Sequence, residues 1–188
     1  MAIKIYIDQG HNPGSPNAGA EGNGYREQDI TYEVGIRLAE LLESNGNFDV
    51  RLSRPTPSTQ LGTSNSTSLK ARVDDANSWG ADYFISIHTN ASLSSSVNGS
   101  EGLVYSAPSE ASALAEDMLR GLTEATGFRN RGIKLRPGLY VLRKTNMPAV
   151  LMEIGFISNP QNANFMANNP SLFAEGMYNG ILDFFSLP

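Results

Sequence analysis

Hydrophobic residues in this chain fall into two alternating patterns. Short, nearly continuous apolar runs are typical of strands buried in a sheet, whereas an apolar residue at every third or fourth position is typical of a helix that buries one face. The apolar runs predict strands at residues 3–8, 48–53, 83–88, 103–105, 139–143 and 149–153. The helical spacing predicts helices at residues 27–44, 68–78 and 109–126.

The C-terminal segment has its own signature of a helix start. Asn169 and Pro170 are typical of an N-cap followed by proline at the first helical position. We therefore predict a last helix, with its inward face formed by Phe173, Met177, Ile181 and Phe184.

Strands and helices alternate along the whole sequence, which favours the α/β class. We expect a twisted, mostly parallel sheet of about six strands with helices on both faces. The 188 residues, of which 40% are hydrophobic, suffice for one sizeable core. Because the sequence has neither an internal repeat nor an evident linker, we predict one domain over residues 1–188.

The predicted loops are unequal in length. Those that leave the carboxyl ends of strands are long (residues 9–26, 54–67 and 89–100), whereas the returns at 45–47 and 79–82 are short. Long loops in a compact domain are usually functional or disordered. Their polar composition is typical of mobile surface, and a groove rim for a polar polymer is the alternative.

Histidine occurs only twice, as His11 and His88, and each follows a predicted strand. Because the carboxyl ends of parallel strands meet at one edge of a sheet, the two imidazoles can converge there. The chain has no cysteine, which leaves imidazole and carboxylate as the ligands of any transition metal. Taken singly, each histidine is more often a structural residue than a ligand.

A zinc hydrolase typically uses three protein ligands and a further carboxylate as base, so the histidines call for acidic partners. Glu27 opens the predicted helix after the His11 loop, and Glu153 ends a very apolar strand, where a lone carboxylate is costly. Each has a simpler interpretation. Glu27 suits a helix N-terminus, and Glu153 can be a buried salt-bridge partner of Arg72 or Arg131.

Two further carboxylates are weaker candidates. Asp8 can accept a hydrogen bond from a metal-bound imidazole, although a turn-forming role is the more ordinary interpretation. Glu101 follows a serine-rich loop and either lines a groove or is simply solvated.

Composition and motifs exclude several classes of function. The net charge of −5 and the lack of a Lys/Arg cluster argue against nucleic acid and anionic membrane surfaces as partners. No segment is long and apolar enough to insert into a membrane. The sequence has no Gly-x-Ser-x-Gly elbow, and its glycines at 19, 22 and 24 do not fit a dinucleotide fingerprint. The chain enters a strand directly after Met1, so we expect no signal peptide in it, or one already removed.

Four separated segments together carry a family resemblance: 7–11 (IDQGH), 25–28 (YREQ), 76–91 (ANSWGADYFISIHTNA) and 147–159 (MPAVLMEIGFISN). They resemble the zinc-dependent N-acetylmuramoyl-L-alanine amidases of the bacterial cell-wall hydrolase type often called amidase 3, which includes autolysins and phage lysins. The segments 51–54 (RLSR) and 130–134 (NRGIK) follow in the expected order. The resemblance therefore extends over nearly the whole chain.

The resemblance implies a role for each candidate residue. His11, Glu27 and His88 match the family's ligands for one Zn²⁺, and Glu153 matches its catalytic glutamate. The implied substrate is peptidoglycan, cleaved at the amide between the lactyl group of N-acetylmuramic acid and the L-alanine of the stem peptide. The implied mechanism uses zinc-activated water with a glutamate general base, and the implied place of action is the bacterial cell wall.

This chain departs from the family pattern beside the first ligand. Gln9 stands where the family usually has proline, and Asn12 where it usually has glycine. Both residues flank His11 without replacing it. We therefore expect them to affect loop shape and substrate fit more than zinc binding.

Two alternatives to the amidase stay open. A zinc carboxypeptidase or deacetylase would act on another cell-wall bond, because a fold does not determine a substrate. A non-catalytic wall-binding or regulatory domain would hold a structural metal. Against the second alternative stands Glu153, since a closed structural site has no use for an additional carboxylate. Oligomeric state cannot be inferred from these patterns.

Overall fold

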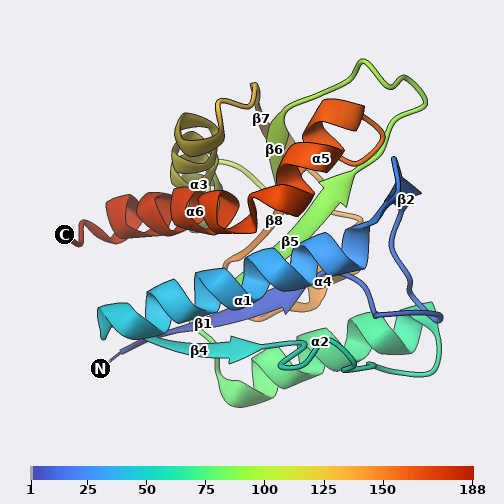
Figure 1. Cartoon of the computed structure of the whole chain (residues 1–188). Helices are drawn as coiled ribbons and strands as arrows, with labels where there is room; N and C mark the ends of the chain where they lie inside the picture. The colour runs from blue at the N-terminus through green and yellow to red at the C-terminus, as the bar shows by residue number, and fades with distance from the viewer. Residues whose placement is uncertain (1) are drawn as a thin grey trace.

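A computed structural model describes residues 2–188 as an α/β fold built on one six-stranded sheet with the order β4-β1-β5-β8-β6-β7 (Figure 1). The strands of this sheet are β1 (Ile3–Gln9), β4 (Phe48–Leu52), β5 (Tyr83–Asn90), β6 (Ser100–Val104), β7 (Asn130–Leu135) and β8 (Ala149–Phe156). A separate two-stranded hairpin consists of β2 (Glu21–Gly22) and β3 (Tyr25–Arg26). The helices are α1 (Glu27–Asn45), α2 (Asn65–Trp79), α3 (Glu110–Thr126), α4 (Tyr140–Lys144), α5 (Pro160–Asn168) and α6 (Pro170–Phe185).

Helices cover both faces of the sheet, and each face has its own hydrophobic cluster. Because side chains alternate along a strand, β1 sends Ile5 and Ile7 to one face and Tyr6 to the other. The larger cluster packs β1, β5 and β8 against α1, α3 and α6, whereas the smaller one packs the opposite face against α2 and α4 (Figure 1). Burial on both faces explains why these strands appear as continuous apolar runs.

Strand direction decides which residues reach the edge of the sheet where the long loops lie. The strands β4, β1, β5 and β8 run parallel, whereas β6 is antiparallel to β8, and β7 is parallel to β6. The carboxyl ends of the first four strands therefore share an edge with the start of β6 and β7. Across three adjacent strands, Glu153 pairs in register with His88 on one side and with Glu101 on the other.

The predicted fold class is confirmed, with six strands that are mostly parallel and helices on both faces. The helix predicted after Asn169 is present, and Phe173, Met177 and Ile181 are fully buried. None of the helices in the described residues has the length and apolar composition needed to cross a membrane.

The strand predicted at residues 139–143 is wrong, because this segment forms the short helix α4. The periodicity of a four-residue apolar run does not distinguish a strand from a buried helical turn. The sixth strand is instead β7, which the pattern missed because it is a half-buried edge strand without a continuous apolar run. The hairpin β2–β3 and helix α5 were also not predicted; both are short.

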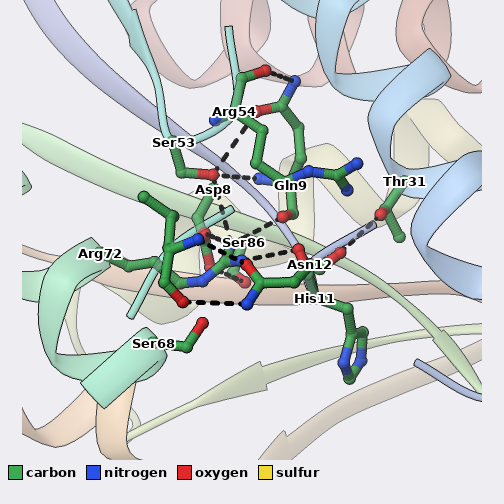
Figure 2. Close-up of polar contacts among 12 residues, drawn as sticks. Asp8, Gln9, His11, Asn12, Thr31, Ser53, Arg54, Ser68, Arg72 and Ser86 are labelled. Carbon is green, nitrogen blue, oxygen red and sulfur yellow. Dashed lines mark hydrogen bonds and ion pairs between the residues drawn. The ribbon is translucent and has the colours of Figure 1, made fainter. Parts of the chain in front are cut away.

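A buried ion pair joins α2 to the end of β1 (Figure 2). Arg72 is 1% exposed, and its Nη1 donates to Asp8 Oδ1 at 2.5 Å and to the carbonyl oxygen of Gln9 at 2.7 Å. Ser86 donates its hydroxyl to the other carboxylate oxygen of Asp8 at 2.7 Å. Burial opposes ionisation of Asp8, but the Arg72 guanidinium outweighs it and holds the pKa of Asp8 below its usual value.

This pairing corrects two interpretations of the sequence. Asp8 neither accepts a hydrogen bond from an imidazole nor simply forms a turn, because both its oxygens are engaged by Arg72 and Ser86. Arg72 is likewise committed to Asp8 and to backbone oxygens, so it is not the partner of Glu153.

We expect Arg72→Met to destabilise the protein by about 3–5 kcal/mol, because it leaves the Asp8 carboxylate buried without its cation. Urea unfolding at pH 7 measures the loss. The difference from wild type should narrow as the pH falls towards and through the lowered pKa of Asp8, because protonation of the carboxylate removes its attraction to Arg72 in wild type and its uncompensated charge in the variant.

The matched control is Lys70→Met, which breaks the exposed pair between Lys70 and Asp74 on the same helix. Exposed pairs contribute at most about 1 kcal/mol. Equal losses in the two variants would contradict the importance of the buried pair.

Candidate metal centre and active site

The structure brings three of the predicted site residues together at the loop-bearing edge of the sheet. His11 comes from the loop after β1, Glu27 from the first turn of α1, and His88 from β5. One nitrogen or oxygen of each lies within 4.8 Å of the others. Glu27 Oε2 is 3.1 Å from His11 Nε2, and Glu27 Oε1 is 3.1 Å from His88 Nδ1.

Local backbone geometry explains how the two histidines approach each other. The amide of Gly10 donates to the carbonyl oxygen of Ile87 at 3.0 Å, which continues the pairing of β1 with β5 to the end of the strands. A Cβ atom at Gly10 would lie 2.5 Å from Cε1 of His88, so only glycine fits there. His11 then turns sharply, with a φ of 68°, which is uncommon for a residue other than glycine.

Glu27 is buried and held from several sides. Its Oε2 accepts from the amide of Ala20 and its Oε1 from the amide of Thr89, both at 2.9 Å. Burial alone would raise the pKa of Glu27, but its hydrogen bonds with His11 and His88 outweigh that effect and hold the pKa far below its usual value. Glu27 is therefore an ionised carboxylate that contacts two imidazoles. The simpler interpretation, that Glu27 only stabilises the N-terminus of a helix, does not explain these contacts.

Glu153 lies beside this group but is not part of it. It is the register neighbour of His88, and its Oε2 is buried with no hydrogen-bond partner among the described residues. Burial, together with the negative charges of Glu27 and Glu101, raises the pKa of Glu153 to about 8. Neither proposed salt bridge to Glu153 exists, because Arg72 pairs with Asp8 and Arg131 pairs with Glu101.

Glu101 is buried rather than solvated, with 6% of its surface exposed. It accepts from Asn90 Nδ2 at 2.9 Å and from Arg131 Nε at 3.2 Å, and it lies opposite Glu153 in the sheet. Sequence reasoning named Arg131 only as a possible partner of Glu153 and did not identify Asn90, so it missed both residues as partners of Glu101. No local signal marks them, because they come from two other strands and meet Glu101 only through the sheet order.

The three converging residues suit a divalent metal ion. Two imidazoles and a carboxylate are a donor set that zinc accepts, although other divalent ions accept it as well. The histidine side chains are 21% and 19% exposed, so the group faces solvent rather than being sealed in the core. The unsatisfied oxygen of Glu153 lies next to it and remains free for another task.

The fold and site together define a class: an α/β protein with a His-Glu-His group at its sheet edge that could hold a metal ion, accompanied by a glutamate whose Oε2 has no partner among the described residues. The chain belongs to the N-acetylmuramoyl-L-alanine amidase family, whose model matches residues 5–183. The resemblance found in the sequence motifs is thus confirmed.

Curated relatives agree with this assignment. The chain is 35% identical to the N-acetylmuramoyl-L-alanine amidase CwlM of Bacillus licheniformis, in an alignment that covers 98% of this chain and 70% of CwlM. It is 38% identical to the amidase LytC of Bacillus subtilis, over 85% of this chain but only 30% of LytC. The chain therefore corresponds to most of one relative and to less than a third of the other.

Solved structures share the fold over almost their whole length. The catalytic domain of the amidase CwlV from Bacillus (Paenibacillus) polymyxa has a TM-score of 0.85 and 30% identity, with 99% of both chains covered. The CwlD amidase from Clostridioides difficile, solved with the GerS lipoprotein, has a TM-score of 0.88 and 27% identity, with 98% of both chains covered.

The raised pKa of Glu153 predicts a pH-dependent cost of folding in the metal-free protein. Between about pH 4.3, where an unfolded glutamate ionises, and about pH 8, the folded state keeps a proton that the unfolded state has lost. Stability should therefore fall as the pH rises through this window. Each pKa unit corresponds to about 1.4 kcal/mol.

Glu153→Gln removes this titration, so its stability relative to wild type should improve steadily from pH 4 to pH 8. Urea unfolding in the presence of a chelator measures the difference. The control Glu116→Gln changes an exposed glutamate on α3 and should track wild type at every pH. A pH-independent difference for Glu153→Gln would refute the prediction.

Proposed function

We propose that residues 1–188 form the catalytic domain of a zinc-dependent N-acetylmuramoyl-L-alanine amidase. Its substrate is peptidoglycan, and the bond cleaved joins the lactyl group of N-acetylmuramic acid to the L-alanine of the stem peptide. Family membership and the names of the relatives support the reaction. The single structural observation that carries the chemistry is Glu153, a half-buried carboxylate whose Oε2 is buried without a hydrogen-bond partner, next to a three-residue group that can hold a metal ion.

In this proposal His11, Glu27 and His88 hold one Zn²⁺. When bound there, zinc would acidify a water molecule at its open position and polarise the scissile carbonyl. The hydrogen bonds from Ala20 and Thr89 fix the carboxylate of Glu27, so this ligand is oriented before the metal arrives.

Glu153 is the general base. Its free oxygen takes a proton from the attacking water as the oxygen of that water bonds to the carbonyl carbon. The same carboxyl group then returns the proton to the alanine nitrogen as the amide bond breaks, which yields a lactyl carboxylate and a free amine. One carboxyl group can perform both transfers in turn, and no covalent intermediate is required.

The two alternatives are less well supported. Among the described residues, the metal-binding group contains three members, whereas a closed structural zinc site takes four. A zinc peptidase or deacylase that acts on another cell-wall bond would use the same site chemistry, but the matched family is named for the amidase reaction. We accordingly place the action of the protein at the bacterial cell wall.

We expect Glu153→Ala to reduce the release of soluble products from purified cell wall by at least about 10²-fold, because proton transfer in the transition state is lost. Bound zinc, measured by atomic absorption, should be unchanged. His88→Ala should instead lose both zinc and activity, and Glu116→Ala should lose neither. Wild-type activity in Glu153→Ala would overturn its assignment as the base.

The bond cleaved is tested by mass spectrometry of digested cell wall. An amidase creates a lactyl carboxylate together with a free L-alanine amine, and we expect both in stoichiometric amounts. Chelator should stop their appearance and added zinc should restore it. Products cut within the stem peptide, or deacetylated sugars, would favour the alternative enzyme class.

A further inference from the structure

Two buried amide side chains, Gln9 and Asn12, flank the His11 turn, and both are 0% exposed. Gln9 Oε1 accepts from the backbone amide of Arg54 at 2.8 Å, and its Nε2 donates to the carbonyl oxygen of the same residue at 3.0 Å. Figure 2 shows Gln9, Asn12 and Arg54 in this network. A side chain that bonds both backbone groups of one residue reproduces the two-bond pairing of neighbouring antiparallel strands.

Asn12 repeats this arrangement at a second point. Its Oδ1 accepts from the amide of Leu61 at 3.1 Å, and its Nδ2 donates to the carbonyl oxygen of Leu61 at 2.9 Å. The same Nδ2 donates to the carbonyl oxygen of Pro16 at 2.8 Å. The metal loop (residues 10–17) is thereby joined to the clamp loop (residues 53–64), which runs from β4 towards α2.

Arg72 links Asn12 to the backbone of His11. Arg72 Nη2 donates to the carbonyl oxygen of His11 at 2.6 Å and to Asn12 Oδ1 at 3.2 Å, so one guanidinium bridges the ligand and its neighbour. His11 has a φ of 68°, in a region that persists for such residues only where the surroundings determine it. The hydrogen bonds of Arg72, Asn12 and Gln9 constrain the backbone on both sides of His11.

We propose that Asn12, assisted by Gln9, is a positioning residue that keeps His11 in its ligating conformation by fastening the metal loop to the clamp loop. This inference rests on the proposed zinc site. The family resemblance implies proline and glycine at these two positions, and neither of those residues has a side-chain amide that could form these hydrogen bonds. Loss of the clamp should weaken metal binding without removing a ligand.

The central test is Asn12→Gly in the full chain. Losing a direct hydrogen-bonding partner of a metal ligand typically costs about 10–100-fold in metal affinity. Because Asn12 acts on His11 through the backbone and through Arg72, we expect zinc affinity to fall by about 10-fold, measured by competition with a chromophoric chelator. Amide hydrogen exchange at Leu61 should accelerate in parallel, because its amide loses the Asn12 acceptor. A purely structural role would lower the unfolding temperature but leave zinc affinity unchanged.

Two further variants make the experiment decisive. Gln60→Ala removes an exposed hydrogen bond from Gln60 Nε2 to the carbonyl oxygen of Ser15, which joins the same two loops without being part of the buried clamp, so it should leave zinc affinity at the wild-type value. Asn12→Asp keeps the acceptor for the Leu61 amide but places a carboxylate oxygen against the carbonyl oxygens of Leu61 and Pro16, so its zinc affinity should also fall below the wild-type value. If Asn12→Gly does not fold, Asn12→Asp takes its place in the zinc measurement.

The outcomes separate this inference from the proposed function. If the wild-type protein binds no zinc, the proposed metal site itself fails. If wild type binds zinc and Asn12→Gly, or Asn12→Asp in its place, binds it equally tightly, the site stands and the positioning role of Asn12 is overturned. Weaker zinc binding in the Asn12 variants, with Gln60→Ala unchanged, supports the clamp.

Discussion

The buried pair of Arg72 and Asp8 is the interaction on which the loop-bearing edge of the sheet depends. One guanidinium neutralises a carboxylate at the end of β1 and also bonds the backbone oxygens of Gln9 and His11. An uncompensated charge in this position would be costly, so the pair holds α2 and β1 together. The same contacts set the direction in which the chain leaves β1, and hence where His11 lies.

Two glutamates at this edge have opposite electrostatic environments. The hydrogen bonds of Glu27 with two imidazoles outweigh its burial and lower its pKa, whereas desolvation and the charges of Glu27 and Glu101 raise the pKa of Glu153. Pairs of carboxylates whose environments separate their pKa values commonly divide the work of a hydrolytic site. In the proposed reaction, Glu27 would be a metal ligand and Glu153 the general base.

Much of the fold could be predicted from hydrophobic periodicity, because strands buried on both faces leave long apolar runs. Errors arose where that signal is weak. The segment from Tyr140 to Lys144 is too short for periodicity to separate helix from strand, and the edge strand β7 buries no continuous run. The convergence of His11, Glu27 and His88 could be anticipated because a parallel sheet brings strand ends to one edge.

The sequence by itself determined the repeated strand-helix pattern, the placement of both histidines at strand ends and the absence of thiolate ligands. Only the tertiary structure decided which charges meet: Arg72 with Asp8, Arg131 with Glu101, and Glu153 with none among the described residues. Ion pairing depends on distances of a few ångströms between residues far apart in the chain. Sheet order and register set those distances, and no local pattern of residues encodes them.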